Sequence, residues 1–117
     1  MISSISYALS GLKAFQNKTG VISNNIANAD TDNFKKSRTI LEESSSGGVK
    51  TSIRQIDSPG MPKEILKNGK SEMVETSNVD LAEELTELIP TTIGYKSNLK
   101  TIQAQEDMLG ALLDVKE

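Results

Sequence analysis

The stretch "ISYALSGLKAFQNKTGVISNNIANA", residues 5–29, decides the fold, because its apolar side chains recur at alternating spacings of three and four. This alternation is typical of the seam of a coiled coil. We predict a helix over about residues 3–28. Since so narrow an apolar ribbon cannot bury itself, this helix needs a partner helix. The repeat runs through Ile5, Ala8, Leu12, Phe15, Thr19, Ile22, Ile26 and Ala29.

The same spacing returns at the other end of the chain. Ser77, Asn78 or Asp80 can cap this second helix, and nearby glutamates place negative charge at its positive end. The two stripes predict a pair of helices, antiparallel or joined terminus to terminus. Pro90 lies within the second stripe, so we expect a kink or a short break around residues 89–94. The second repeat runs through Leu81, Leu85, Leu88, Thr92, Tyr95, Leu99, Ile102, Glu106, Leu109 and Leu113.

The segment between the two stripes, residues 37–76, has a different character. "ESSSGGVK" (43–50) is typical of a flexible loop, and the alternation after it predicts a strand from Val49 to near Ile56. "EILKNGKSEMVE" (64–75) predicts a β-hairpin with Asn68-Gly69 in or beside its turn. The fold class is therefore mainly α, with long N- and C-terminal helices in a coiled-coil-like pair and a small β-rich insertion.

Composition excludes several classes of function. The chain of 117 residues has no His and no Cys, so it offers no catalytic triad, no thiolate chemistry and no imidazole or thiolate metal site. Its net charge of −3 comes without a basic, aromatic-interleaved patch, which disfavours nucleic acid. The N-terminus has neither the basic region nor the apolar run of a cleaved signal peptide. We predict no catalytic residue, no cofactor, no metal site and no small-molecule substrate.

Two polar clusters need separate consideration. The carboxylates of Asp80, Glu83, Glu84 and Glu87 share a helix face, which we interpret as charge bias at a helix start on a solvated face. In "NNIANADTDNFKKS" (24–37), Asp30 through Asn33 are suited to ending the helix and turning the chain. The earlier amides lie inside the helical repeat, where Asn costs several tenths of a kcal/mol relative to Ala. An intermolecular role for them is left open by the residues alone.

Together, the two ends resemble a known family. "ALSGLKAFQNKTGVISNNIANADTDNFKK" (8–36) is similar to the N-terminal signature of the bacterial flagellar basal-body rod and hook proteins. Residues 77–117 resemble the C-terminal signature of that family, with matches at Ser77-Asn78-Val79-Asp80, Glu84, Tyr95, Asn98 and Met108-Leu109. Asp32-Asn33 replace the Pro-Gly usual in the family. The short middle segment is most like the small proximal-rod members.

The resemblance implies a non-enzymatic rod subunit with three segments: an N-terminal helix and Asn-rich turn (1–36), the insertion (37–76) and a C-terminal helix (77–117). It implies export by the flagellar type III apparatus without a cleaved signal, assembly with itself and other rod subunits, and location in the basal body. The alternative is a soluble coiled-coil adaptor or export chaperone. The expected assembly-interface residues are Ile5, Leu12, Phe15, Ile22, Asn24, Asn25, Ile26, Asn28, Leu85, Leu88, Tyr95, Asn98, Leu99, Ile102 and Leu109.

Overall fold

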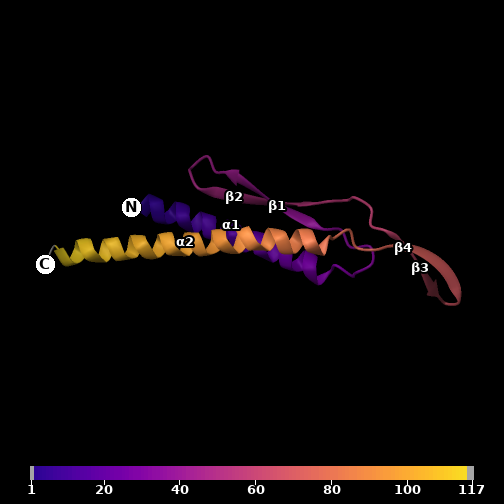
Figure 1. The fold of residues 1–117 in the computed structure, drawn as a ribbon. Coiled ribbons are helices and arrows are strands. Elements are labelled where there is room, and N and C mark those ends of the chain that lie inside the picture. The colour runs from indigo at the N-terminus through magenta and orange to yellow at the C-terminus, as the bar shows by residue number, and fades with distance from the viewer. Residues whose placement is uncertain (1, 116–117) are drawn as a thin grey trace.

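The protein is an elongated helix pair that carries two β-hairpins (Figure 1). The computed structural model describes residues 2–115, so Met1 and residues 116–117 of the predicted end segments lie outside the described residues. The molecule measures 81 × 25 × 21 Å. Its elements are α1 (Ile2–Ala27), β1 (Ser37–Glu43), β2 (Val49–Gln55), β3 (Pro62–Lys67), β4 (Lys70–Glu75) and α2 (Leu81–Val115).

The two long helices pack side by side in opposite directions, which confirms the predicted pair. Small residues let the helices approach closely: a Cβ added at Gly94 would lie 2.5 Å from the Phe15 ring, and one at Gly11 would lie 2.7 Å from Asn98 Oδ1. Gly11 pairs with Asn98 near the N-terminus of α1, and Asn25 pairs with Glu84 near its C-terminus. The last turns of α2 therefore extend past the start of α1 (Figure 1).

The face of α2 that meets α1 differs from the predicted one. Glu84 and Thr91 are fully buried, whereas Leu85 and Leu99 of the predicted seam are 50% and 42% exposed. The physical reason is that small and hydrogen-bonded side chains permit a closer helix approach than leucines do. The prediction of the pair was correct, but the leucine side of the stripe lies away from α1.

Of the kink or short break expected around residues 89–94, the break is absent, because α2 is one continuous helix of 35 residues. Proline removes one backbone donor, which leaves the carbonyl of Thr86 without its helical partner. Pro90 and Thr86 are both exposed, so water can hydrate that carbonyl. Long packing against α1 then offsets a cost of about 3 kcal/mol.

The two hairpins are separate two-stranded antiparallel sheets. β1 and β2 pack along α1, while β3 and β4 project beyond the end of the helix pair (Figure 1). The hairpin predicted around Asn68-Gly69 is confirmed, and both residues have positive φ, 53° and 75°. The predicted strand at Val49 is also present, but its partner β1 was missed because "SRTILEE" has no clean alternation of apolar and polar residues.

The chain turns between α1 and β1 through the Asx-rich run. α1 ends at Ala27, and Asn33 adopts the left-handed conformation with φ of 63°. Its N–H donates to the carbonyl of Glu75, 2.9 Å away. Asn33 thus takes a backbone conformation that glycine favours, at the place of the glycine in the family signature. The predicted cap of α2 is also present, since Asp80 Oδ1 accepts the N–H of Ala82 at 3.0 Å. Between residues 2 and 115, no helix is both long and apolar enough to cross a membrane.

Gly94 and Gly110 make a matched pair for testing the close helix approach. Gly94→Gln places a side chain against Phe15, so we expect a loss of about 1 to 3 kcal/mol of unfolding free energy. Gly110→Gln has open space around it and gains helix propensity, so we expect a gain below about 1 kcal/mol. Urea unfolding followed by circular dichroism measures both. Equal effects of the two substitutions would contradict the close approach.

Candidate assembly site

A buried cluster of polar side chains joins α1, β1 and α2. The Glu84 carboxylate is fully buried; Asn25 Nδ2 donates to its Oε2 at 3.2 Å, and Arg38 Nη1 donates to its Oε1. Arg38 Nη2 also donates to Glu83 Oε1 at 2.7 Å. We call Asn25, Arg38 and Glu84 the polar clamp. Each member comes from a different element, so the cluster forms only when all three elements are in place.

Asn25 also fastens the start of β1 to α1. Its Nδ2 donates to the carbonyl of Ser37 at 2.9 Å, and its Oδ1 accepts the N–H of Ser37 at 3.0 Å. A second amide, Asn78, closes the other side of this junction. Asn78 Oδ1 accepts the N–H of Lys36 at 2.7 Å, and its Nδ2 donates to the carbonyl of Ile56 at 2.8 Å. At the open end of the first hairpin, the side-chain amides of these two asparagines therefore make backbone hydrogen bonds of the kind that a further strand would make.

Electrostatics reinforce this junction. Burial lowers the pKa of Arg38, but hydrogen bonds and coulombic attraction from Glu84 and Glu83 outweigh it and raise that pKa above its ordinary value. The hydrogen bond from Arg38 lowers the pKa of Glu83. The hydrogen bond from Lys35, 2.8 Å away, likewise lowers the pKa of Glu75 at the base of β4.

The structure corrects two interpretations of polar residues. Asn25 is fully buried and satisfied inside its own chain, so the expectation that it faces other subunits is wrong. Glu84 does not belong to a solvated face but is the buried carboxylate of the polar clamp. The sequence marked Asn25 as unusual, since Asn is costly inside a helix, but it did not indicate that Arg38 would be its neighbour.

The other acidic residues near the start of α2 have structural partners. Asp80 caps the helix, and Glu87 lies 3.2 Å from Lys18 of α1. Glu83 pairs with Arg38 and Lys36. Among residues 2–115, no three acidic side chains gather as metal ligands would.

The remaining two asparagines of the run bond to one another. Asn28 Nδ2 donates to the carbonyl of Asn24 at 2.9 Å, and Asn28 Oδ1 accepts the hydroxyl of Thr31 at 3.1 Å. Asn28 is half-buried and helps to end α1, whereas Asn24 is exposed. An intermolecular contact by Asn24 stays a prediction.

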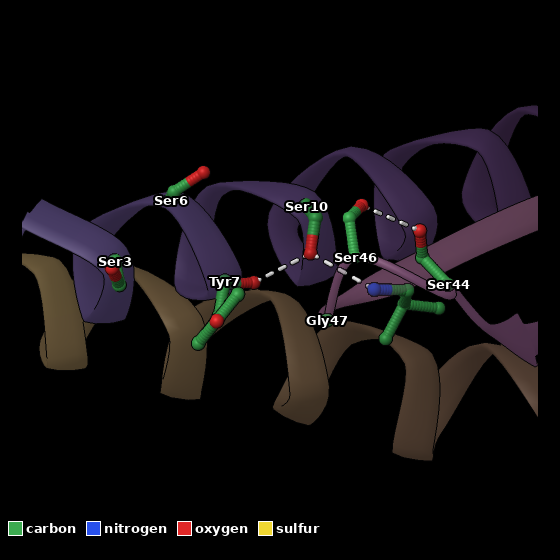
Figure 2. Close-up of a pocket in the computed structure, with 8 residues that line it drawn as sticks. Ser3, Ser6, Tyr7, Ser10, Ser44, Ser46 and Gly47 are labelled. Atoms are coloured by element: carbon green, nitrogen blue, oxygen red, sulfur yellow. Dashed lines mark hydrogen bonds between the residues drawn. The ribbon is translucent and has the colours of Figure 1, made fainter.

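A polar pocket lies between the first turns of α1 and the β1–β2 turn (Figure 2). Ser10 Oγ donates to the carbonyl of Tyr7 at 2.7 Å and accepts the N–H of Val49 at 3.0 Å. Ser44 and Ser46 hydrogen-bond one another across the turn at 3.1 Å. Among residues 2–115, no basic side chain lines the pocket. The Ser10 hydroxyl therefore fastens the turn to the helix.

α2 carries a set of large exposed apolar side chains, which we call the outer stripe; Leu81, Leu85 and Leu99 lie on one flank of the helix, and Leu109 and Leu113 lie where α2 extends past the start of α1. Around Leu99 and Ile102 it forms an open, mostly apolar groove of about 390 Å³. Gly20 leaves a second hollow beside Thr92 and Tyr95, where an added Cβ would contact nothing. Exposed large apolar side chains gathered beside such hollows are typical of a protein–protein contact. The outer stripe comprises Leu81 (47% exposed), Leu85 (50%), Leu99 (42%), Leu109 (43%) and Leu113 (61%).

The predicted interface residues divide by exposure. Ile22 and Asn25 are buried, and Asn24, Leu85, Leu99 and Leu109 are exposed. The half-buried residues are Ile5, Leu12, Phe15, Ile26, Asn28, Leu88, Tyr95, Asn98 and Ile102.

The N-terminal and C-terminal segments of the chain both match known protein families. Residues 5–35 match the family described as "Flagella basal body rod protein". Residues 70–115 match the family described as "Flagellar basal body rod FlgEFG protein C-terminal". The first match covers most of α1 with the Asx-rich turn, and the second covers β4 and α2.

Curated relatives extend the likeness to the whole chain. The flagellar basal body rod protein FlgB of Bacillus subtilis is 30% identical over 105 residues, which cover 82% of this chain and 81% of that protein. The rod protein FlgC of Borreliella burgdorferi is 26% identical over 147 aligned positions, covering 98% of this chain and 97% of that protein. FlgG of Bacillus subtilis is 49% identical over 43 residues, which are 37% of this chain and 16% of that protein.

The helix pair and the relatives define a class of non-enzymatic structural subunits. The chain belongs to the flagellar basal-body rod protein family, close to the proximal-rod proteins. It is a structural subunit of that rod. The resemblance stated from the two terminal signatures is thereby confirmed.

The polar clamp predicts unequal effects at two neighbouring glutamates. Glu84→Gln leaves Arg38 without its buried carboxylate, so we expect a loss of about 3 kcal/mol of unfolding free energy. Glu83→Gln removes the ion pairs of a half-exposed carboxylate with Arg38 and Lys36 and should cost less than about 1 kcal/mol. Urea unfolding of the two variants measures the difference. Equal costs would show that the buried bond has no special role.

The lowered pKa of Glu83 predicts a pH dependence. Its folded pKa lies below its ordinary value of 4.5, so its contribution to stability is complete above that value and is lost as the pH falls through the folded pKa. In Glu83→Gln this part of the loss of stability at low pH disappears. Unfolding midpoints of the parent and the variant, compared over falling pH, should converge in acid. Parallel curves would contradict the assignment.

Proposed function

We propose that the chain polymerises through the paired terminal helices, with the outer stripe of α2 receiving helices of neighbouring rod subunits. The observation that carries this proposal is the exposure of large apolar side chains on the flank and the C-terminal turns of a helix that already packs against α1. An isolated subunit leaves this surface in water. Assembly removes it from water and gains about 25 cal/mol per Å².

The hollows along the outer stripe support the same proposal. Gly20 and Thr92 leave room beside Tyr95, and the groove at Leu99 and Ile102 continues on the same side of α2. Helices pack by placing side chains of one into such gaps of the other. The candidate contact residues are Leu85, Leu99 and Leu109, with Asn24 at the far end of α1.

The proposal also covers how the subunit is exported to the rod. A rod subunit of this kind is exported by the flagellar type III apparatus without cleavage of a signal peptide, and it then builds the drive shaft for motility. The absence of cysteine suits passage through an oxidising compartment, since no wrong disulfide can form. The family assignment removes the basis for the alternative of a soluble adaptor or export chaperone.

Substitutions at buried and exposed apolar positions separate folding from assembly. Leu99→Asp places a charge on the outer stripe, where the isolated subunit leaves the side chain 42% exposed. We expect normal helix content in circular dichroism, but loss of polymer in sedimentation and loss of swimming when the variant replaces the parent in cells. Ile22→Asp, at a position that is 3% exposed, should instead unfold the helix pair.

Ser97→Asp is the matched control for Leu99→Asp. It adds the same charge two positions away, about 200° around the helix at roughly 3.6 residues per turn. Ser97 is exposed, so this variant should fold, polymerise and support swimming. Polymer formation and swimming by Leu99→Asp at the parent level would overturn the proposed role of the outer stripe.

A further inference from the structure

α2 is longer than the helix against which it packs. Gly11 lies against Asn98, and because the two helices run in opposite directions, the start of α1 at Ile2 is level with Asp107. Residues 108–115 of α2 therefore have no residue of α1 beside them (Figure 1). The packing within one chain leaves the last turns of α2 without a partner helix.

One side of α2 carries a glutamate within a row of leucines that runs into this unpaired end. Leu99, Glu106 and Leu113 follow one another at intervals of seven residues, close to two helical turns, so they lie on the same side of the helix. Leu109 borders that side, three residues after Glu106. The three leucines are 42%, 61% and 43% exposed in the order in which they are named here. Glu106 is exposed and forms no ion pair with any residue that the structure describes.

The outer face of α1 carries a stripe with the opposite charge. Leu9, Lys13, Gln16 and Gly20 recur at spacings of four, three and four, and all four are exposed. Within residues 2–115, Lys13 forms no ion pair. A Cβ added at Gly20 would contact nothing, and a hollow of about 400 Å³ lies between this part of α1 and α2. This face therefore presents an apolar, a positive and an empty position in one row.

We propose that the outer face of α1 of one copy packs antiparallel on this side of α2 of a second copy, with Lys13 opposite Glu106. In that register Gly20 lies opposite Leu99, whose side chain fills the hollow. The contact rests on the polymerisation proposed above, and it names the surface that the C-terminal half of α2 receives.

The same register covers the unpaired end of α2. Leu9 of the neighbouring copy lies between Leu109 and Leu113, so three exposed apolar side chains meet. The first turns of the neighbour's α1 then lie along residues 108–115, which α1 of the same chain does not reach. The excess length of α2 is thereby used in the contact between copies.

The direction of the packing lets the contact repeat. A neighbour whose α1 is antiparallel to α2 points the same way as the first copy, because the two helices of one chain are themselves antiparallel. Within one chain Lys13 is level with Lys96, whereas in the contact it is level with Glu106, ten residues or about 15 Å further along α2. A contact between unlike surfaces does not close on a pair, so copies offset in this way form an open array. This is the geometry that a rod requires.

Three separate features favour a second copy as the occupant. The opposite charges of Lys13 and Glu106, the match of the Leu99 side chain to the space at Gly20, and the uncovered turns of α2 all fit in one register. A charged residue within an apolar seam selects the partner and the register of a helix pair. The chain therefore carries both halves of the contact.

Charge exchange in the full chain tests the central contact. Lys13→Glu places two carboxylates opposite one another, and Glu106→Lys places two ammonium groups there. We expect either variant to need about tenfold more protein before polymer sediments, and to impair swimming when it replaces the parent in cells. The chain with both changes restores opposite charges and should polymerise and swim as the parent does.

Asp107→Lys is the matched control for Glu106→Lys. It makes the same change of charge one residue away, about 100° around the helix, on a side that the proposed contact leaves free. Asp107 is exposed, so this variant should fold, polymerise and support swimming at the parent level.

The space at Gly20 tests the direction of the packing. Gly20→Leu fills the hollow, and because nothing lies near that position within the chain, the variant should keep its helix content in circular dichroism while losing polymer about tenfold. Adding Leu99→Ala shortens the opposing side chain and should recover polymer. Adding Leu113→Ala instead should recover none. Recovery by Leu113→Ala would indicate parallel helices and would overturn the antiparallel register.

The outcomes separate this contact from the proposed function. Single charge variants at the parent level, a double exchange without recovery, or full polymer formation by Gly20→Leu would each overturn the contact. If Leu99→Asp still abolishes polymer in that case, the outer stripe remains an assembly surface with a different occupant. Polymer of Leu99→Asp at the parent level would instead overturn the proposed function, and the contact with it.

Discussion

A buried carboxylate that must find its partners constrains the whole arrangement. Removing Glu84 from water costs several kcal/mol unless hydrogen bonds and an opposite charge compensate. Asn25 and Arg38 provide that compensation from α1 and β1, and they do so in one alignment of the three elements. A repeat of apolar side chains alone would tolerate sliding by a heptad. We infer that the polar clamp fixes both the register of the helix pair and the position of the first hairpin on α1.

The clamp also explains why the outer stripe is free. α2 turns its small and polar side, with Glu84, Thr91 and Gly94, toward α1. The leucines one position away then lie on the flank of the pair. A single chain therefore folds around polar contacts and close backbone approach, and it leaves several of its larger apolar side chains exposed. Such a division suits a subunit that must fold in a defined register before it joins an assembly.

Much of this fold could be predicted from the sequence because it depends on local pattern. The three-and-four spacing of Ile5 to Ala29 and of Leu81 to Leu113 indicated the helices, and Asn68-Gly69 indicated the second hairpin. Predictions failed where distant groups decided the outcome. Pro90 does not interrupt α2, because packing along α1 compensates locally unfavourable chemistry. Asn25 and Glu84 gave no sign of being partners, since 59 residues separate them.

The sequence by itself determined the class of fold, the turn positions and the family, because periodicity, turn chemistry and terminal signatures are carried by neighbouring residues. The tertiary structure alone decided which side of α2 faces α1 and which amide is buried. Those features depend on distances between remote segments. Coulombic and packing energies act through space, so a linear pattern does not determine them.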